Sequence, residues 1–323
     1  MSHKITSLRT GDPVVYRDYF QWQHLHPGYW PGWLGIGLLW LLSRLPFDLQ
    51  LKVGRGLGTL LYYLLPSRRK VTLTNLKLAF PSMPDNEITS LAKVNYKHVG
   101  MGVAEAASFW FRPTQDYVSR FSLEDAHHLD QALAQGKGVI LLQAHFTLVD
   151  FTASVMCQHY QVYAVYAKSK NAMFGALLKN RRERYMQEMI ENHDIRRMVR
   201  QLKKGSLIWY SPDQYVSARR GGVATPYFGQ PAMTTPGTAR IAAMTGAIVI
   251  PMIPIRLTDG GRYKLTFYPP LDLSGLDSDA ATLKVNQLFE KQVKEQPDQY
   301  LWMHKRFKPI DSSQPNPYSR ASR

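Results

Sequence analysis

The sequence has only one cysteine among its 323 residues, Cys157. An intrachain disulfide is therefore impossible, and we expect a packed thiol in a protein that works in a reducing compartment. Acidic residues are also few, since 24 Asp and Glu stand against 40 Lys and Arg, for a formal net charge of +16. Unless it is only a solvated basic surface, this excess predicts an acidic partner: nucleic acid, anionic lipid or an acidic protein.

Motifs of several common enzyme classes are missing. The sequence contains no Gly-x-Ser-x-Gly motif, which argues against a serine hydrolase that forms an acyl-enzyme. The stretch Gly54–Gly58 lies among apolar, helix-like residues and not between a strand and a helix, so we do not interpret it as a phosphate-binding loop. The histidines lack metal-ligand spacing to acidic residues or to the cysteine. We therefore expect no metal and no cofactor.

A long apolar run is missing too. The uncharged stretch Trp30–Leu42 has 13 residues, fewer than the roughly 20 that a spanning helix needs, and a second stretch, Leu57–Leu65, follows it. Tryptophans in the first stretch suit a membrane interface. We expect 29–66 to be a membrane-anchoring helical region that either spans the bilayer or only embeds in it. A buried hairpin of the core is the alternative.

The rest of the chain is expected to follow this region as one main domain, 67–310. A polar segment, 1–28, precedes the apolar region, and a polar tail, 311–323, is expected to be disordered. Six Lys and Arg follow Trp30–Leu42 up to residue 70, against three before it, so the positive-inside bias predicts a main domain on the cytoplasmic side. No small-residue cleavage site is present, and we expect the N-terminal segment to be retained.

Periodicity predicts alternating helices and strands in the main domain, which is typical of an α/β fold with a mixed central sheet flanked by helices. The predicted helices are 71–79, 88–111, 151–158 and 172–191. The predicted strands are 138–143, 161–166, 207–210, 247–255 and 262–268, with a turn at 259–261 joining the last two.

The most informative pair is His145 and Asp150, which follow the buried strand predicted at 138–143. Catalytic groups in such sheets gather where strands end. Five helical steps separate two side chains by roughly 140°, so we place His145 before the helix and Asp150 in its first turn. The carboxylate would then accept a hydrogen bond from one imidazole nitrogen and leave the other nitrogen as a base. A purely structural pair is the alternative.

Such a base suits the removal of a proton from a hydroxyl that attacks an activated acyl group, and the reaction would be acyl transfer. A second carboxylate, Asp213, lies at the end of the strand predicted at 207–210.

These segments resemble the late acyltransferases of lipid A biosynthesis, the lauroyl and myristoyl transferase group. The resemblance extends from about residue 29 to residue 307 and rests on seven blocks: Gly32–Gly37, Asn75–Leu76 with Phe80–Pro81, Gly100–Gly102, His145–Asp150, Ile208–Gln214, Ile248–Ile255 and Gln299–Phe307. The motif around the histidine is shared with the wider glycerolipid acyltransferases.

The resemblance implies an inner-membrane enzyme with its catalytic domain on the cytoplasmic face. Its donor would be an acyl thioester of acyl carrier protein, and its acceptor a hydroxyl on an acyl chain of the Kdo-bearing lipid A precursor. No nucleic acid partner is expected. An acidic carrier protein and a phosphorylated lipid both need a basic docking surface near the bilayer, which accounts for the charge.

The resemblance also implies roles for individual residues. His145 is expected to be the general base, oriented by Asp150 where close relatives often have glutamate. Arg182 and Arg184 correspond to the family's basic pair and are expected to bind substrate phosphate, although a solvated helix face would give the same pattern. Asp213 is expected to orient a substrate or an arginine. Relatives have arginine and proline where this chain has Ala167-Lys168.

Two alternatives stay open. An acyltransferase with the same His-Asp turn could act on a glycerophospholipid or another glycolipid, with acyl-CoA or acyl carrier protein as donor. A basic membrane-binding protein without catalysis would keep its function when His145 is replaced.

Overall fold

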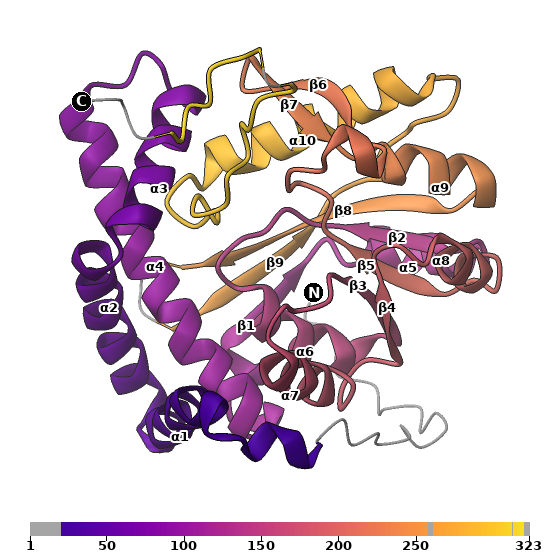
Figure 1. Cartoon of the computed structure of the whole chain (residues 1–323). Helices are drawn as coiled ribbons and strands as arrows, with labels where there is room; N and C mark the ends of the chain where they lie inside the picture. The colour runs from indigo at the N-terminus through magenta and orange to yellow at the C-terminus, as the bar shows by residue number, and fades with distance from the viewer. Residues whose placement is uncertain (1–20, 258–260, 312, 320–323) are drawn as a thin grey trace.

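The structure, a computed structural model, describes residues 21–257, 261–311 and 313–319 (Figure 1). Its centre is a seven-stranded sheet in the order β1-β9-β8-β2-β5-β3-β4. A separate antiparallel hairpin, β6 and β7, lies outside this sheet. The strands are β1 (Phe121–Glu124), β2 (Val139–Leu142), β3 (Val162–Tyr166), β4 (Glu188–Glu191), β5 (Leu207–Tyr210), β6 (Val223–Tyr227), β7 (Gln230–Thr234), β8 (Ile248–Arg256) and β9 (Tyr263–Phe267).

The sheet is mixed, as the sequence predicts. Strands β8, β2, β5, β3 and β4 run parallel to one another, while β9 pairs antiparallel with β8 and parallel with β1. The carboxyl ends of β2, β5, β3 and β4 therefore share one edge, where the chain leaves each strand for its next helix.

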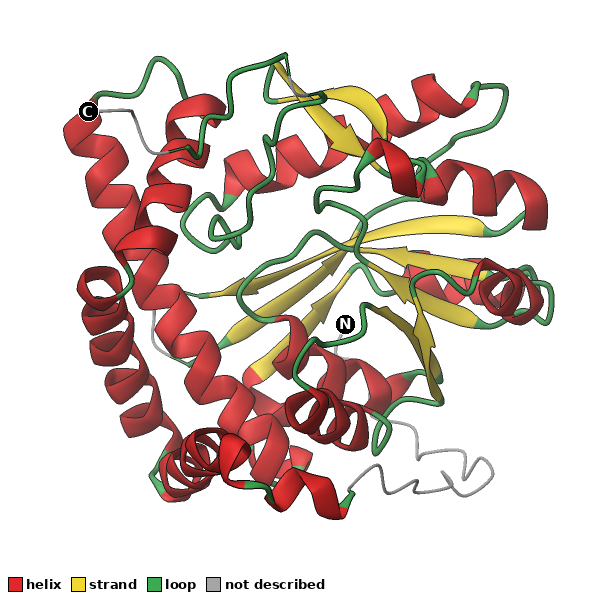
Figure 2. Cartoon of the chain, viewed as in Figure 1, coloured by secondary structure: helices red, strands yellow, loops and turns green. Residues whose placement is uncertain are grey.

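Helices cover both faces of the sheet (Figure 2). The α-helices are α1 (Trp30–Arg44), α2 (Phe47–Leu64), α3 (Pro66–Ala79), α4 (Asp85–Phe111), α5 (His127–Ala134), α6 (Val149–His159), α7 (Ala172–Arg182), α8 (Ile195–Leu202), α9 (Gly237–Thr245) and α10 (Ser278–Glu295). Alternate residues of β2 face opposite sides, as a pleated strand requires. Ile140 and Leu142 join the core beneath α8, α9 and α10, whereas Val139 and Leu141 join the core beneath α5 and α6.

Helix α4 joins the two cores. Its first half contributes Ile88 and Tyr96 to one core, and its second half contributes Phe109 and Trp110 to the other. Apolar residues of α4 thus pack on both sides of the sheet. The helix also passes close to the edge at which β2 ends. A Cβ atom on Gly102 would lie 2.4 Å from the carbonyl oxygen of Thr147, so the helix and the turn after β2 are in direct backbone contact.

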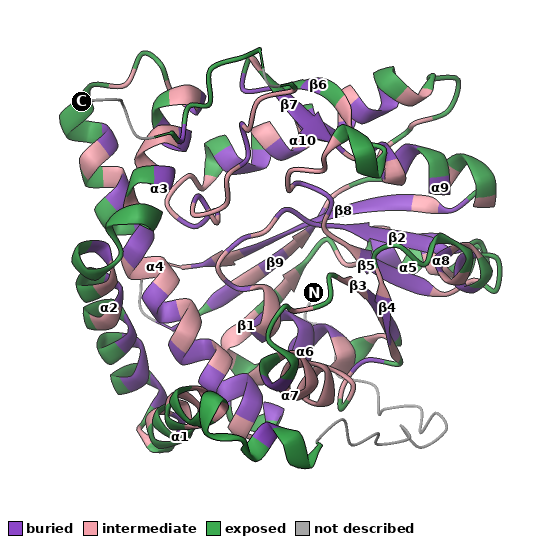
Figure 3. Cartoon of the chain, viewed as in Figure 1, coloured by how far each residue is buried: buried purple, intermediate pink, exposed green. Residues whose placement is uncertain are grey.

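Helices α1 and α2 pack on α4 and leave a large apolar surface exposed (Figure 3). The exposed apolar side chains on these helices include Trp30, Leu34, Leu38, Trp40, Leu41, Leu49, Val53, Leu60, Tyr63 and Leu64. Among the residues that the structure describes, none of the helices is both long enough and apolar enough to cross a bilayer. We use the term apolar face for the exposed apolar side chains of α1 and α2 named above.

Glycines set the contact between α2 and α4. A Cβ atom on Gly58 would lie 2.0 Å from the carbonyl oxygen of Tyr96, and one on Gly100 would lie 2.1 Å from that of Gly54. Real Cβ atoms do not come so close to backbone, so a larger residue at either position would push the helices apart. The glycine-rich stretch 54–58 is thus a helix-packing surface, in agreement with its interpretation as helical sequence.

The structure corrects two expectations. The predicted helix 172–191 is helical only as α7, and its end is strand β4, which pairs with β3 at the edge of the sheet. The tail was expected to be disordered, yet Tyr318 is buried and its hydroxyl bonds to the side chain of Asn75 on α3. The predicted turn 259–261 lies mostly outside the described residues, as does most of the segment 1–28.

Candidate active site

Two neighbouring parallel strands bring His145 and Asp213 together. The register pairs Leu142, the last residue of β2, with Tyr210, the last residue of β5. His145 and Asp213 each follow three residues after those ends, so the two side chains emerge at equivalent places on the same edge. This placement agrees with the strand-end positions predicted from the sequence for both residues.

The contact between them is double. The imidazole Nδ1 of His145 lies 2.5 Å from Oδ1 of Asp213, and the backbone N–H of His145 donates to Oδ2 at 3.0 Å. The carboxylate is fully buried, whereas the imidazole keeps 27% of its side-chain surface exposed. Within the described part of the chain, Nε2 of His145 has no hydrogen-bond partner. The imidazole is therefore held by Asp213 at Nδ1, and part of its ring is exposed to solvent.

His145 and Asp213 shift each other's pKa. Burial lowers the pKa of His145, but the charge of Asp213 and its hydrogen bond outweigh burial and raise the pKa above the ordinary 6.5. Burial raises the pKa of Asp213, but His145 and the hydrogen bonds around the carboxyl group lower it to about 2. Asp213 is therefore ionised at neutral pH, and the imidazole is an oriented base of increased basicity.

The structure gives Asp150 a different contact from the expected one. Its carboxylate lies in the first turn of α6 and binds Arg182, with Nε donating to Oδ1 at 2.8 Å and a second nitrogen 2.6 Å away. The contact with an imidazole nitrogen that the sequence predicts for Asp150 is made by Asp213 instead, at Nδ1 of His145. Physically, α6 directs Asp150 toward the end of α7, whereas the register of β2 and β5 brings Asp213 to the imidazole. Asp150 acts on His145 only through its charge.

Arg182 and Arg184 are separated by the end of a helix. Arg182 is the last residue of α7, is about one fifth exposed, and is close enough for its charge to lower the pKa of His145. Arg184 lies beyond the helix and is exposed. Arg182 is thus brought close to the histidine, and the binding role of Arg184 stays a prediction.

A segment near the C-terminus completes the site. The hydroxyl of Tyr300 donates to Oδ2 of Asp213 at 2.9 Å, so the carboxylate has three donors. Backbone bonds join the same segment to the turn after β2: Leu301 N–H donates to the carbonyl of His145 at 2.8 Å, and Thr147 N–H donates to that of Gln299 at 2.9 Å. The sequence predicts no role for Tyr300, because this segment lacks a strand pattern and enters only as one block of the family resemblance.

His304 is a second histidine beside the pair. Its Nε2 accepts a hydrogen bond from the backbone N–H of Tyr215 at 3.3 Å. Its pKa is lowered to about 4, mainly by burial; the charge of Asp213 opposes this shift and that of His145 adds to it. His304 is therefore neutral at neutral pH, and its Nε2 is a hydrogen-bond acceptor. No sequence spacing relates it to His145, and only the fold reveals their proximity.

Comparison with known proteins agrees with this geometry. The sequence model of the bacterial lipid A biosynthesis acyltransferase family matches residues 17–309. The chain belongs to this family. It is an acyltransferase of lipid A biosynthesis, as the resemblance of its motifs predicts.

Relatives within the family differ in the acyl chain that their names specify. The chain is 34% identical to the lipid A biosynthesis lauroyltransferase of Escherichia coli strain K12, over 91% of this chain and 96% of the relative. It is 30% identical to the palmitoleoyltransferase of the same strain, over 90% and 94%, and 25% identical to the myristoyltransferase, over 91% and 92%.

A solved structure, the 1-acyl-sn-glycerophosphate acyltransferase PlsC from Thermotoga maritima, is also similar. The match covers 75% of this lipid A acyltransferase and 97% of the PlsC chain, with a TM-score of 0.36 and 17% identity. This level of similarity supports no inference about the acceptor.

Proposed function

We propose that this protein transfers a fatty acyl chain from acyl carrier protein to a hydroxyl on an acyl chain of the Kdo-bearing lipid A precursor, with His145 as general base. The observation that carries the proposal is the buried Asp213 carboxylate on Nδ1 of His145, which leaves Nε2 free on an imidazole that is 27% exposed. An imidazole held in this tautomer is prepared to accept a proton.

His145 moves one proton during the proposed transfer. Nε2 of His145 takes the proton from the acceptor hydroxyl while its oxygen attacks the thioester carbonyl. The tetrahedral intermediate collapses, the carbon–sulfur bond breaks, and the leaving thiolate takes the proton back from the imidazolium. Asp213 stays ionised and stabilises that imidazolium. The products are an ester on the acceptor and the free thiol of the donor.

Arg182 supports the binding of the acceptor in this proposal. The Asp150 carboxylate holds Nε and one terminal nitrogen of the guanidinium, which leaves donors on its other side for a substrate phosphate. Arg182→Gln is expected to raise the acceptor KM more than it lowers kcat, because binding is present in ground and transition states alike. Arg184 stays a predicted contributor to the same binding.

A double-mutant cycle separates this role of Asp150 from the orientation of His145. Asp150→Asn should raise the acceptor KM, and adding Arg182→Gln should raise it little further, because both changes disable one guanidinium. If Asp150→Asn instead lowers kcat and shifts the pH profile while the acceptor KM stays constant, then Asp150 acts on the histidine.

The apolar face supports attachment to the inner membrane. Monomeric soluble proteins rarely expose so many large apolar side chains on adjacent helices. We propose that α1 and α2 lie in the bilayer interface with the catalytic domain on the cytoplasmic side. Attachment by apolar burial should survive washing with high salt, and release by 1 M salt alone would contradict it.

Mass spectrometry of lipid A tests the function directly. A strain lacking this gene should accumulate lipid A without one secondary acyl chain, and the mass difference gives the length of that chain. The wild-type gene should restore the chain, whereas His145→Ala, expressed at the same level, should not. Unchanged lipid A together with altered glycerophospholipids would overturn the proposed acceptor.

A further inference from the structure

A row of positive charge lies on the outer surface of α8. Four exposed cations follow one another at spacings of four, three and one residues, which puts them on one side of the helix and its C-terminal turn. We call this row the basic stripe; it consists of Arg196, Arg200, Lys203 and Lys204. None of the four side chains has a hydrogen bond or ion pair with another residue in the described part of the chain.

Helix stability does not account for the stripe. Like charges four residues apart, as in Arg196 with Arg200, destabilise a helix. Arg196 also lies in the first turn, where the helix dipole disfavours a cation. The adjacent Arg197 differs, because it is neutralised by Glu188 through nitrogen–oxygen contacts of 2.7 and 3.1 Å. The fold therefore compensates one arginine of the helix and leaves the stripe uncompensated.

The stripe lies far from the apolar face. Helix α8 packs against β5 and α9 at one end of the molecule, whereas α1 and α2 are at the opposite end, packed on α4 (Figure 1). With the apolar face on a bilayer, the stripe points to the aqueous side. Its partner is then a soluble anionic surface, and not the same membrane.

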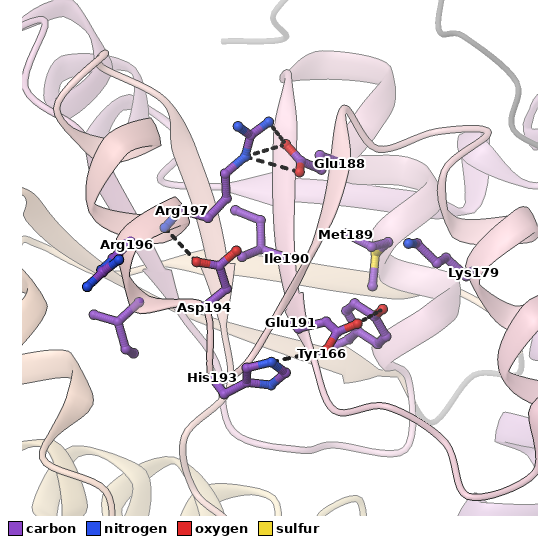
Figure 4. Close-up of a pocket in the computed structure, with 11 residues that line it drawn as sticks. Tyr166, Lys179, Glu188, Met189, Ile190, Glu191, His193, Asp194, Arg196 and Arg197 are labelled. Carbon is purple, nitrogen blue, oxygen red and sulfur yellow. Dashed lines mark hydrogen bonds and ion pairs between the residues drawn. The ribbon is translucent and has the colours of Figure 1, made fainter.

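A pocket connects the stripe with the catalytic edge. It has a volume of about 510 Å³ and lies where β3 and β4 end, with Arg196 on one side and Lys179 on the other (Figure 4). Lys179 is on α7, one helical turn before Arg182, the arginine that binds Asp150. A chain that starts at the beginning of α8 and crosses this pocket therefore reaches α7 at Lys179, three residues before Arg182.

We infer that the basic stripe is the docking site of the acidic carrier protein, and that the pocket receives the arm that carries its acyl thioester. This inference rests on the proposed function and adds to it where the donor binds. Acidic side chains on the carrier pair with the stripe, and the arm passes through the pocket beside Lys179 toward the histidine. Long-range attraction between the two surfaces speeds their encounter.

Charge reversal tests the docking site. The variant Arg196→Glu with Arg200→Glu changes the net charge by −4, and the matched control Lys93→Glu with Lys291→Glu makes the same change at exposed lysines of α4 and α10. Full-length proteins in detergent are assayed with two donors, an acyl carrier protein bearing a saturated acyl thioester and the same acyl group on pantetheine. The stripe variant should raise the KM for the carrier-bound donor about tenfold and leave the KM for acyl-pantetheine unchanged.

The outcomes distinguish docking from function. Equal effects of the stripe variant and the control, or equal effects on both donors, overturn the docking site. Binding of a fluorescent carrier protein is measured separately. If wild type uses acyl-pantetheine but does not bind the carrier, the docking site is wrong and the transfer activity stands; if it binds the carrier through the stripe but transfers from neither donor, the transfer activity is wrong. Loss of binding to anionic vesicles in place of the carrier would assign the stripe to a lipid surface.

Discussion

Two charged centres of this protein are built from the same parts and differ in exposure. In one, the buried carboxylate of Glu105 binds Arg256 through contacts of 2.6 and 2.7 Å and accepts the hydroxyl of Tyr263 at 2.7 Å. In the other, the buried Asp213 binds His145 and accepts the hydroxyl of Tyr300. Each centre thus consists of a carboxylate, a cationic or basic group and a tyrosine.

The difference lies in the basic partner. Arg256 is buried, and its third donor group contacts His98, so nothing in that centre faces solvent. His145 keeps about a quarter of its surface exposed. A guanidinium also cannot release its proton near neutral pH, whereas an imidazole exchanges one readily. The closed centre can therefore only stabilise the fold, and the open centre can take part in chemistry.

The largest effect should come from removing the open base. His145→Ala should lower acyl transfer by about 10³- to 10⁴-fold, because it removes the proton acceptor, and should leave the thermal midpoint of unfolding close to wild type. Purified variant and wild type are compared in one assay with equal amounts of folded protein. Retention of more than a tenth of the activity would remove His145 from the mechanism.

Replacement of its partner should have a smaller effect with a distinct pH signature. Asp213→Asn should lower the plateau rate by roughly 10²-fold, because the imidazole loses its orientation. The carboxylate raises the pKa of His145, so its loss lowers that pKa. Since the base must be neutral, the acid limb of the rate profile should move to lower pH. A profile that keeps its midpoint would show that Asp213 does not act on the histidine.

The closed centre should respond in stability. Glu105→Met leaves Arg256 charged and unpaired in the interior and should cost about 3 to 5 kcal/mol of stability, measured by urea unfolding in detergent. The double replacement Glu105→Met with Arg256→Met should recover much of this loss, since no buried charge remains. Activity per folded molecule at low temperature should stay close to wild type. A loss of activity without a loss of stability would contradict the comparison.

The two tyrosines allow the smallest and sharpest test. Tyr300→Phe removes a donor from Asp213, so the carboxylate acts more strongly on His145 and raises its pKa further; the acid limb should move to higher pH, with a rate loss of a few-fold. Tyr263→Phe removes the matching hydroxyl from Glu105 and should lower stability by about 1 kcal/mol without moving the profile. Identical pH profiles for the two variants would mean that Tyr300 is only structural.

The sequence was most informative where local pattern and structure coincide. Short β-rich runs predicted β2, β3, β5, β8 and β9, and the residues that follow two of them predicted His145 and Asp213 at strand ends. The partnership of these two was not predictable, because it depends on the register of strands 68 residues apart in the chain. Both carboxylates were visible, and spacing along the chain favoured the nearer one, Asp150.

Other features depend on long-range pairing as well. Strand β4 has only two apolar residues between glutamates and follows a basic helix, so its local sequence does not indicate a strand. Only its pairing with β3 defines it as one. Tyr300 gains its role from a single antiparallel bridge between its backbone and that of Phe146. The buried Tyr318 likewise depends on a contact with α3 that no local composition indicates.

The glycine contacts of α4 have a geometric consequence for an enzyme with a lipid substrate. On one side, Gly58 and Gly100 bring α2 and α4 into backbone contact; on the other, Gly102 brings α4 against Thr147, two residues from His145. With the apolar face in the bilayer, as proposed, these backbone contacts hold the turn that carries His145 close to the helices that lie on the membrane. The glycines thus keep the layers between the membrane and the base as thin as backbone contact allows, and a methyl group at any of them would move His145 away from the bilayer.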